Sequence, residues 1–327
     1  MGKVTIRDIS DEAGVSIATV SRVFHKKNVS QDAVSRVHDA AKRLGYSIPD
    51  YTASRPRLIA VIVPRLSNPF YNDILDGIQD TAVRNSYNVI ISQSKSEMGF
   101  SAAPPPFLAG GIVDGLITLE HSDNLKSLLA MVDPELSIVQ CCEYDENLPY
   151  PYVSIDNYKA AYNAVTYLES TGRKRIALLN STTHSLYGKK REEGYADAVR
   201  DLGLPLERDL VYHLNTIDLT VGYSAALSLL SQDNRPDAIF TVSDIYAVAV
   251  TRAARKLELS VPQDVAVVGF DNIEMAAMNE PPLTTIHQPR YEIGAVACNT
   301  LLGMIKKRPQ MSKELLLESE IVVRSST

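Results

Sequence analysis

Short apolar runs alternate with longer amphipathic stretches along the chain beyond residue 57. The first run, Leu58–Val63, is apolar throughout and ends at Pro64, which is typical of a strand covered on both faces. Further runs predict strands over Val89–Ser92, Gly115–Leu119, Ser137–Cys141, Arg175–Leu179, Ala238–Val242 and Val265–Gly269. Apolar residues at helical spacing predict helices over Phe70–Asn85, Lys159–Ser170, Arg191–Leu202, Val221–Leu230 and Ile245–Leu257. Because strands alternate with helices, we expect parallel sheets with crossover helices, and the length fits two such sheets.

Residues 99–111 do not follow this alternation. A crossover helix is due there, but three consecutive prolines, Pro104–Pro106, interrupt any long helix because proline lacks the backbone N–H group. We therefore expect a shortened helix or a loop in this segment.

The first 46 residues predict three short helices. Thr5, Ser16 and Ser30 stand where each helix would begin, and their hydroxyls can accept hydrogen bonds from backbone N–H groups that otherwise lack partners. Apolar residues at helical spacing supply a small core: Ile9, Ala13, Val20, Val23, Val34, Val37, Ala41 and Leu44.

The segment Ile6–His25 fits a helix-turn-helix. Gly14 falls where the tight turn needs a positive φ, and Ala13, Val20 and Val23 can pack the two helices together. The outward positions of the second helix could then meet base edges and phosphates in a major groove: Ile17, Ala18, Ser21 and Arg22. The alternative is a generic helical hairpin with a solvated face.

The charge distribution favours nucleic-acid binding by one end of the chain. The net charge is −6, which alone argues against such binding. Residues 1–57, however, hold ten Lys/Arg and six Asp/Glu, whereas residues 58–327 hold 23 Lys/Arg and 33 Asp/Glu. A basic head on an acidic body can meet phosphates with the head.

The remaining composition excludes several other classes. The three cysteines, Cys141, Cys142 and Cys298, form no CxxC pair, and the histidines show no ligand spacing, so we expect no metal, cofactor or disulfide. No apolar run is long enough to span a bilayer, and no apolar signal segment opens the chain, so we expect a cytoplasmic protein without membrane contact.

These motifs together resemble the lactose-repressor (LacI/GalR) family. The matching segments of the head are Val4–Ile9, Ala13–Arg22, Val29–Ser30 and Leu44–Tyr46. The resemblance implies a homodimer whose heads read the halves of a palindromic operator, with Ile17, Ala18 and Arg22 at bases and Thr19 and Ser21 at phosphates. The full DNA-binding set that we predict is Thr5, Ser16, Ile17, Ala18, Thr19, Ser21, Arg22 and Tyr46. Ser10 stands where the family usually has alanine.

Residues 47–57 predict a linker that departs from the family. The segment is polar, and Pro49 and Pro56 discourage a continuous helix. Relatives usually carry a short hinge helix here whose leucines enter the minor groove, but no leucine occurs between residues 45 and 57. We therefore expect this linker to stay extended or disordered without DNA.

The resemblance extends over the body, with matches at Asn68–Tyr71, Ile155–Asn157, Arg191–Tyr195, Gly269–Asn272 and Pro281–Gln288. It implies an α/β fold: an all-α helix-turn-helix head (1–46), the linker (47–57), and a periplasmic-binding-protein-like body (58–327) of two parallel-sheet subdomains. We assign about 58–157 and 287–313 to the first subdomain and about 158–286 and 314–327 to the second, with a C-terminal strand exchanged back.

The effector should bind beyond the carboxyl ends of the parallel strands. The predicted effector-binding residues are Asn68, Phe70, Tyr71, Arg191, Ser243, Asp271 and Gln288. Phe70 and Tyr71 could stack on a sugar or base, or could be core residues. Arg191 and Asp271 could bind hydroxyl or ring polar groups. Alternatively, Arg191 could pair with a structural carboxylate and Asp271 could cap the following helix.

We therefore expect a non-enzymatic transcription regulator, a repressor controlled by a small sugar or nucleoside. The segments Pro281–Gly294 and Ile155–Asn157 resemble the cytidine- and ribose-responsive members most. A Rossmann-type enzyme is disfavoured because Pro64–Pro69 is no glycine-rich phosphate loop. A solute-binding receptor would share the body fold, but the DNA-binding head opposes that alternative.

Overall fold

A computed structural model describes the chain apart from residues 1–4, 25–28, 47–56, 95–104, 110–111, 121, 131, 183–184 and 310–311. The chain divides into two compact units, Met1–Arg57 and Leu58–Thr327, which are described separately below. The linker expected at 47–57 lies outside the described residues except for Arg57.

The head consists of α1 (Ile6–Ala13), α2 (Ile17–Phe24) and α3 (Gln31–Arg43). Thr5, Ser16 and Ser30 accept hydrogen bonds from the first turns of these helices, as the sequence predicts. The buried core contains Ile9, Ala13, Val20, Val23, Phe24, Val37, Ala40 and Ala41.

The first half of the body, here called the N lobe, contains a six-stranded sheet in the order β11-β5-β4-β3-β1-β2, parallel at every pair. Its strands are β1 (Leu58–Val63), β2 (Asn88–Gln93), β3 (Gly115–Thr118), β4 (Ser137–Cys141), β5 (Tyr152–Ile155) and β11 (Glu314–Leu317). Its helices are α4 (Phe70–Arg84), α5 (Pro106–Ala109), α6 (Ser122–Leu129) and α12 (Arg290–Ile305).

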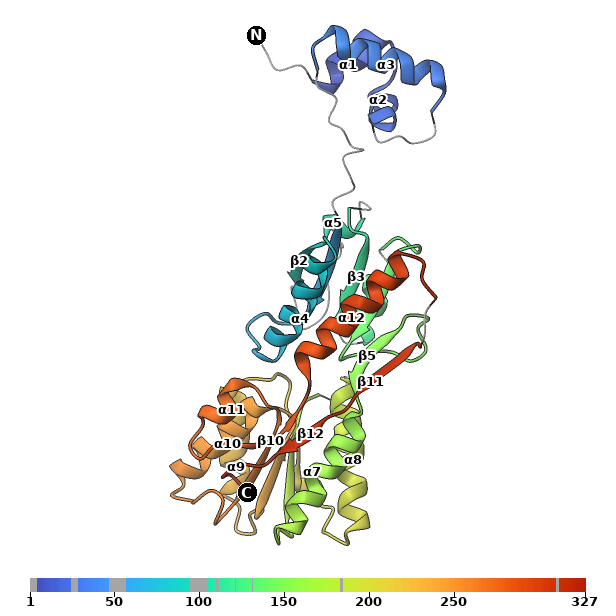
Figure 1. The fold of residues 1–327 in the computed structure, drawn as a ribbon. Coiled ribbons are helices and arrows are strands. Elements are labelled where there is room, and N and C mark those ends of the chain that lie inside the picture. The colour runs from blue at the N-terminus through green and yellow to red at the C-terminus, as the bar shows by residue number, and fades with distance from the viewer. Residues whose placement is uncertain are drawn as a thin grey trace. The chain divides into compact units, whose positions relative to one another are not determined.

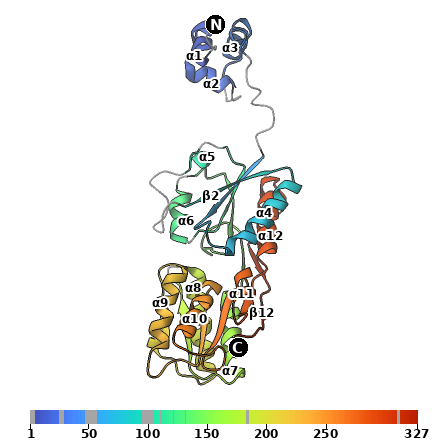
Figure 2. The same cartoon turned by 90° about the vertical axis from the view of Figure 1, so that its left-hand side faces the viewer.

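Strand β1 shows why the N-lobe strands are apolar throughout. Its side chains alternate between two faces, so Ile59, Val61 and Val63 join the core on the α4 side. Ala60 and Ile62 pack instead with residues of α5 and α6. The two pairs of helices cover opposite faces of the sheet (Figure 2).

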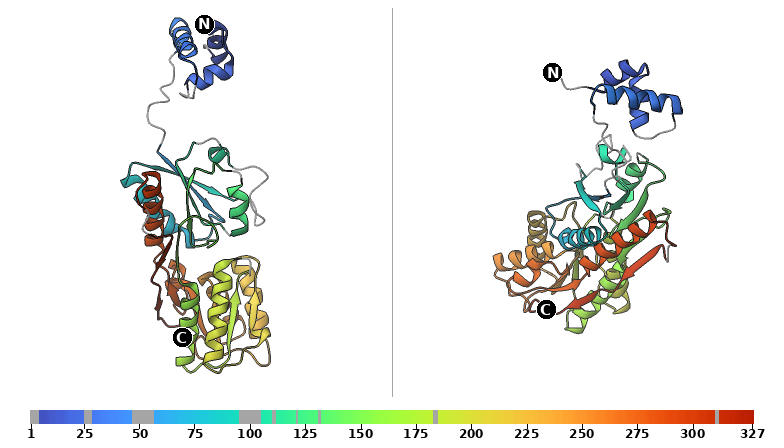
Figure 3. Two further views of the ribbon diagram at one scale, coloured as in Figure 1. Left: turned by 90° about the vertical axis from the view of Figure 1, so that its right-hand side faces the viewer. Right: turned by 45° about the horizontal axis from the view of Figure 1, so that its top comes forward.

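Helices α4 and α12 pack closely against each other, as Figures 1 and 3 show. A Cβ atom on Gly77 would lie 2.0 Å from the carbonyl oxygen of Tyr291, and one on Gly294 would lie 2.0 Å from that of Ile74. Both positions therefore need glycine, because the backbones approach too closely for a side chain.

The second half of the body, here called the C lobe, has a sheet in the order β12-β10-β9-β8-β6-β7, in which only the β10–β12 pair is antiparallel. Its strands are β6 (Ile176–Asn180), β7 (Val211–His213), β8 (Ala238–Thr241), β9 (Ala266–Asp271), β10 (Thr284–His287) and β12 (Glu320–Val322). Its helices are α7 (Asn157–Ser170), α8 (Leu186–Asp201), η1 (Arg208–Leu210), α9 (Leu219–Leu230), α10 (Asp244–Lys256) and α11 (Glu274–Met278).

The chain crosses between the lobes after β5, after β10 and between β11 and β12. The boundary that the sequence analysis places at 313/314 is wrong. Strand β11 pairs with β5, so Glu314–Leu317 belongs to the N lobe and the third crossing follows Leu317. The reason is long-range pairing, which the local pattern around residue 314 does not reveal.

The predicted strands and helices are all present, with shifted ends. Within 99–111, residues 106–109 form the short helix α5, and residues 99–104, 110 and 111 lie outside the described residues. Helix α8 begins at Leu186, five residues before the predicted start at Arg191. In the described part of the chain, no helix is long and apolar enough to cross a membrane.

Candidate DNA-binding surface and effector cavity

The turn of the helix-turn-helix is fixed by backbone geometry and by α3. Gly14 has φ 62°, the left-handed conformation that the sequence predicts for it. The Arg36 guanidinium donates to the carbonyl oxygens of Ala13 and Gly14 at 2.7 and 3.0 Å. The hydroxyl of Ser10 donates to the carbonyl oxygen of Val15 at 2.6 Å, so this serine adds a bond across the turn.

Three polar side chains hold the starts of α1 and α2. Thr5 and Asp8 form a reciprocal capping box, and the backbone N–H of Thr19 donates to the Ser16 hydroxyl at 3.1 Å. The capping bonds hold the pKa of Asp8 below its ordinary value. These contacts satisfy backbone groups while leaving Thr5 and Ser16 exposed.

The predicted DNA-binding residues fall into two groups. Thr5, Ser16, Ile17 and Arg22 are exposed, and Ile17 exposes 51% of its surface although it is apolar. Thr19 and Tyr46 are half-buried, and the Tyr46 ring stacks on Phe24 with centroids 6.0 Å apart. The structure describes the backbone of Ala18 and Ser21 but not their side chains.

A cavity of about 510 Å³, counted to its open mouth, lies between the two lobes. All seven predicted effector-binding residues line it. The N lobe supplies Asn68, Phe70 and Tyr71 at the start of α4, where the backbone N–H of Phe70 donates to the Asn68 side chain at 3.0 Å. The two aromatic rings meet edge to face with centroids 5.2 Å apart. Both rings also pack on the core, so Phe70 and Tyr71 can be core residues and still line the cavity.

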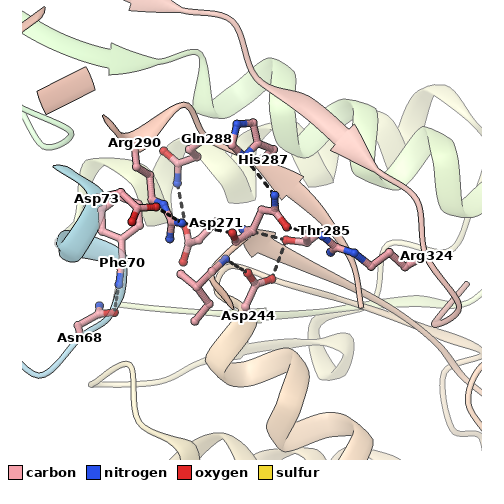
Figure 4. Close-up of polar contacts among 12 residues, drawn as sticks. Asn68, Phe70, Asp73, Asp244, Asp271, Thr285, His287, Gln288, Arg290 and Arg324 are labelled. Atoms are coloured by element: carbon pink, nitrogen blue, oxygen red, sulfur yellow. Dashed lines mark hydrogen bonds and ion pairs between the residues drawn. The ribbon is translucent and has the colours of Figure 1, made fainter. Parts of the chain in front are cut away.

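Asp271 is a buried, hydrogen-bonded carboxylate of the cavity. It ends β9, and its carboxylate accepts a hydrogen bond from the Gln288 amide at 2.8 Å (Figure 4). It also accepts one from the Ser243 hydroxyl at 3.2 Å. Burial raises the pKa of Asp271 to about 6, against the opposing positive charge of Arg191. Its φ of 108° lies in a region rarely adopted outside glycine, which aims the side chain into the cavity edge.

Arg191 is buried on α8 among aromatic rings. Its guanidinium carbon lies 3.4 Å from the Phe270 ring centroid and 4.9 Å from that of Tyr187. Nε donates to the Asn157 side chain at 2.9 Å, and Nη1 donates to the carbonyl oxygen of Val242 at 2.7 Å. These bonds hold the guanidinium in place, and its burial lowers its pKa.

Asp244 is a second buried carboxyl, in addition to Asp271. It accepts hydrogen bonds from the backbone N–H of Ile273 at 2.9 Å and from the Thr285 hydroxyl at 2.6 Å, as Figure 4 shows. Asp244 rather than Asp271 therefore bonds to the segment that starts α11. Burial, followed by the charge of Asp271, raises the pKa of Asp244 to about 8. A Cβ on Gly269 would lie 2.1 Å from its carboxylate, which explains the glycine there.

Eight further residues line the cavity that the sequence did not predict: Leu119, Cys142, Glu143, Ser154, Asn157, Tyr187, Ile217 and Val242. A signal existed for two of them, because Cys142 and Glu143 directly follow the predicted strand Ser137–Cys141 at its carboxyl end. Tyr187 was missed because α8 starts earlier than predicted. The cavity thus combines polar groups for hydroxyls with aromatic and aliphatic faces.

Two family models match the chain. Residues 5–49 match the bacterial regulatory proteins of the lacI family, and residues 165–327 match a periplasmic binding protein-like domain. Catabolite control protein A of Priestia megaterium is 34% identical over 337 residues, covering 99% of both chains. The chain belongs to the lacI family of bacterial regulatory proteins.

Other relatives and solved structures resemble the chain. The HTH-type transcriptional repressor CytR of Escherichia coli strain K12 is 32% identical and covers 99% of this chain and 96% of its own length. A solved complex of the regulator CelR with cellobiose has a TM-score of 0.74 at 28% identity, covering 99% of this chain and all of that one. A ribose-bound regulator from Enterococcus faecium has a TM-score of 0.71 at 26% identity, covering 83% and 98%.

These relatives confirm the predicted fold and the predicted class. This lacI-family chain is a DNA-binding transcription regulator, and the helix-turn-helix head excludes a receptor consisting of the binding-protein fold alone.

Proposed function

We propose that the chain represses transcription as a cytoplasmic homodimer, and that a small sugar or nucleoside in the cavity controls its binding to an operator. The observation that supports this effector class most is the cavity lining. It places the polar groups of Asp271, Arg191 and Gln288 near the aromatic pair Phe70 and Tyr71. Bidentate polar groups suit hydroxyls, and aromatic faces suit the apolar side of a sugar or base.

The position of the cavity suggests how the effector acts. Ligand atoms that bind residues of both lobes favour arrangements in which the lobes approach each other, since only those satisfy both sets of contacts. An effector changes operator affinity only to the extent that it binds one arrangement of the lobes more tightly than another. By thermodynamic linkage, operator DNA must change the affinity for the effector by the same factor.

The solved neighbours support sugars as the first candidates. One solved neighbour carries ribose and another carries cellobiose. The residues proposed to bind the effector here are Asn68, Phe70, Tyr71, Arg191, Ser243, Asp271 and Gln288.

Two measurements on the full-length chain test the proposal. A thermal-unfolding screen of pentoses, hexoses, disaccharides and nucleosides identifies the effector, because a ligand at about 100 times its Kd adds roughly 2.7 kcal/mol to stability. Operator binding is then measured with and without that compound. We expect at least one hit that changes operator affinity, and a hit without any effect on DNA binding would contradict the proposal.

A further inference from the structure

The first turn of helix α8 forms part of the cavity wall through Tyr187. The start of a helix presents backbone N–H groups without partners in the helix and carries a partial positive charge. Such an end is a ready site for phosphate or another anion. In this chain, the cavity residues already satisfy that end of α8.

Each N–H group that opens α8 has an acceptor. The backbone N–H groups of Leu186 and Tyr187 donate to the two carboxylate oxygens of Glu143 at 3.0 and 2.9 Å. That of Gly188 donates to the Ser185 hydroxyl at 3.2 Å, and that of Lys189 donates to the Ser185 carbonyl oxygen at 3.1 Å. A ligand anion would therefore have to displace an acceptor.

Glu143 reaches α8 from the opposite lobe. It follows β4 in the N lobe, whereas α8 belongs to the C lobe, and only 4% of its surface is exposed. The Ser185 and Ser181 hydroxyls also lie close to the helix end, since a Cβ on Gly188 would lie 2.6 and 2.7 Å from them. An anion at this end would have to replace the Glu143 carboxylate, which accepts from the N–H groups of Leu186 and Tyr187.

The charges that line the cavity point the same way. Among the described residues they are Glu143, Asp271 and Arg191, two acidic groups and one basic group. The positive charge of Arg191 already favours the charged form of Asp271, against the effect of burial on its pKa. A phosphate group would add negative charge to a cavity in which the one cation of the described lining is already engaged.

We propose that Glu143 determines effector specificity by charge: its carboxylate occupies the anion-binding end of α8, so the cavity accepts uncharged sugars or nucleosides and rejects their phosphates. This inference rests on the proposed function and adds the class of ligand that the cavity excludes. Glu143 acts here as a specificity-determining residue that takes the place of a ligand anion.

The test uses inorganic phosphate as the probe, so it does not depend on the identity of the effector. Thermal unfolding of the full-length chain is followed at pH 7.5 in sodium phosphate and in sodium chloride of equal ionic strength. The variants are E143A, E143Q and, as a matched control, E146A, which removes an exposed carboxylate from the same loop. E143Q keeps the shape of the side chain in case E143A does not fold.

We expect phosphate to raise the Tm of E143A and, to a smaller extent, of E143Q, with an apparent Kd at least about tenfold below that of the wild-type chain. Wild type and E146A should unfold at the same temperature in both salts. Equal phosphate effects in wild type and E143Q would overturn the inference.

A matched pair of ligands separates this inference from the proposed function. Ribose should stabilise the wild-type chain more than ribose 5-phosphate, and E143Q should narrow that difference. Equal stabilisation of the wild type by both compounds would also overturn the role of Glu143. Failure of every uncharged sugar and nucleoside to affect operator binding would instead contradict the proposed effector class, whatever the phosphate result.

Discussion

The head and the effector cavity hold their binding side chains differently. In the head, Ile17 and Arg22 are exposed, and the described residues provide no hydrogen bond or ion pair for Arg22. In the cavity, Arg191 and Asp271 expose only 4% and 6% of their surfaces, and both are hydrogen-bonded to neighbours. Ile17 and Arg22 of the head can therefore change without affecting folding, whereas Arg191 and Asp271 of the cavity also stabilise the body.

The largest effect should follow loss of a buried charge. We expect Arg191→Ala to lower the free energy of unfolding by about 3–5 kcal/mol, because buried Asp271 would lose the larger of the two positive charges that offset it, those of Arg191 and Arg290. Chemical denaturation of the body measures this change, and loss of effector binding should accompany it. An unchanged stability would show that the cavity residues are as independent of folding as those of the head.

Stability should also fall as the pH rises. The fold raises the pKa of Asp244 to about 8, whereas an aspartate of the unfolded chain loses its proton near its ordinary value of 3.8. Between these values the folded state binds more protons, so each pH unit lowers stability by up to about 1.4 kcal/mol.

Denaturation at several pH values between 5 and 8 measures this slope. Asp244→Asn keeps an uncharged side chain at every pH, so its curve should be flatter than that of the wild type. A wild-type stability that rises over this range would contradict burial as the dominant cause.

In the head, a substitution should change DNA binding without changing stability. We expect Arg22→Ala to weaken operator binding by roughly 1–3 kcal/mol and to relax base preference at one position in each half-site. Its Tm should equal that of the wild type, since the side chain is exposed. Gel-shift titrations with single-base operator variants provide the measurement, and unchanged sequence preference would remove Arg22 from the reading set.

The smallest effect concerns the cap of α1. Thr5→Ala removes the hydroxyl of the capping box and should destabilise the head by about 1 kcal/mol. Amide hydrogen exchange can follow the head separately from the body, and exchange in α1 should accelerate while the body is unaffected. Ser35→Ala is a suitable control because Ser35 is exposed within α3.

The sequence predicted the features that depend on local patterns. Gly14, the three caps and the alternation of strands with helices follow from propensities over a few residues. The carboxyl-end rule led to five of the seven predicted lining residues, and the family resemblance supplied Arg191 and Gln288. The contact of Glu143 with α8 could not be predicted in this way, because the partners are more than 40 residues apart in sequence. The contact of Arg36 with the turn at Gly14 could not be predicted either, because Arg36 lies on a separate helix 22 residues further along the chain.

The pairing of the edge strands could not be predicted from the sequence either. Glu314–Leu317 is too short for a clear periodicity, and its assignment to the N lobe depends on pairing with Tyr152–Ile155, which lies far away in the sequence. The burial of Asp244 could not be predicted from the sequence, because it follows from the missing side chain of Gly269 and from the bond to Thr285. These features emerge only when the chain packs.

The crossing between β11 and β12 has a consequence for protein synthesis. One short segment, 314–322, supplies an edge strand to both sheets. A ribosome has therefore translated most of both lobes before either sheet can be completed. A chain released just before residue 314 would leave β5 and β10 each with an unpaired edge, and such edges invite pairing with other chains. Premature termination at that point should yield aggregating fragments rather than a folded body without a tail.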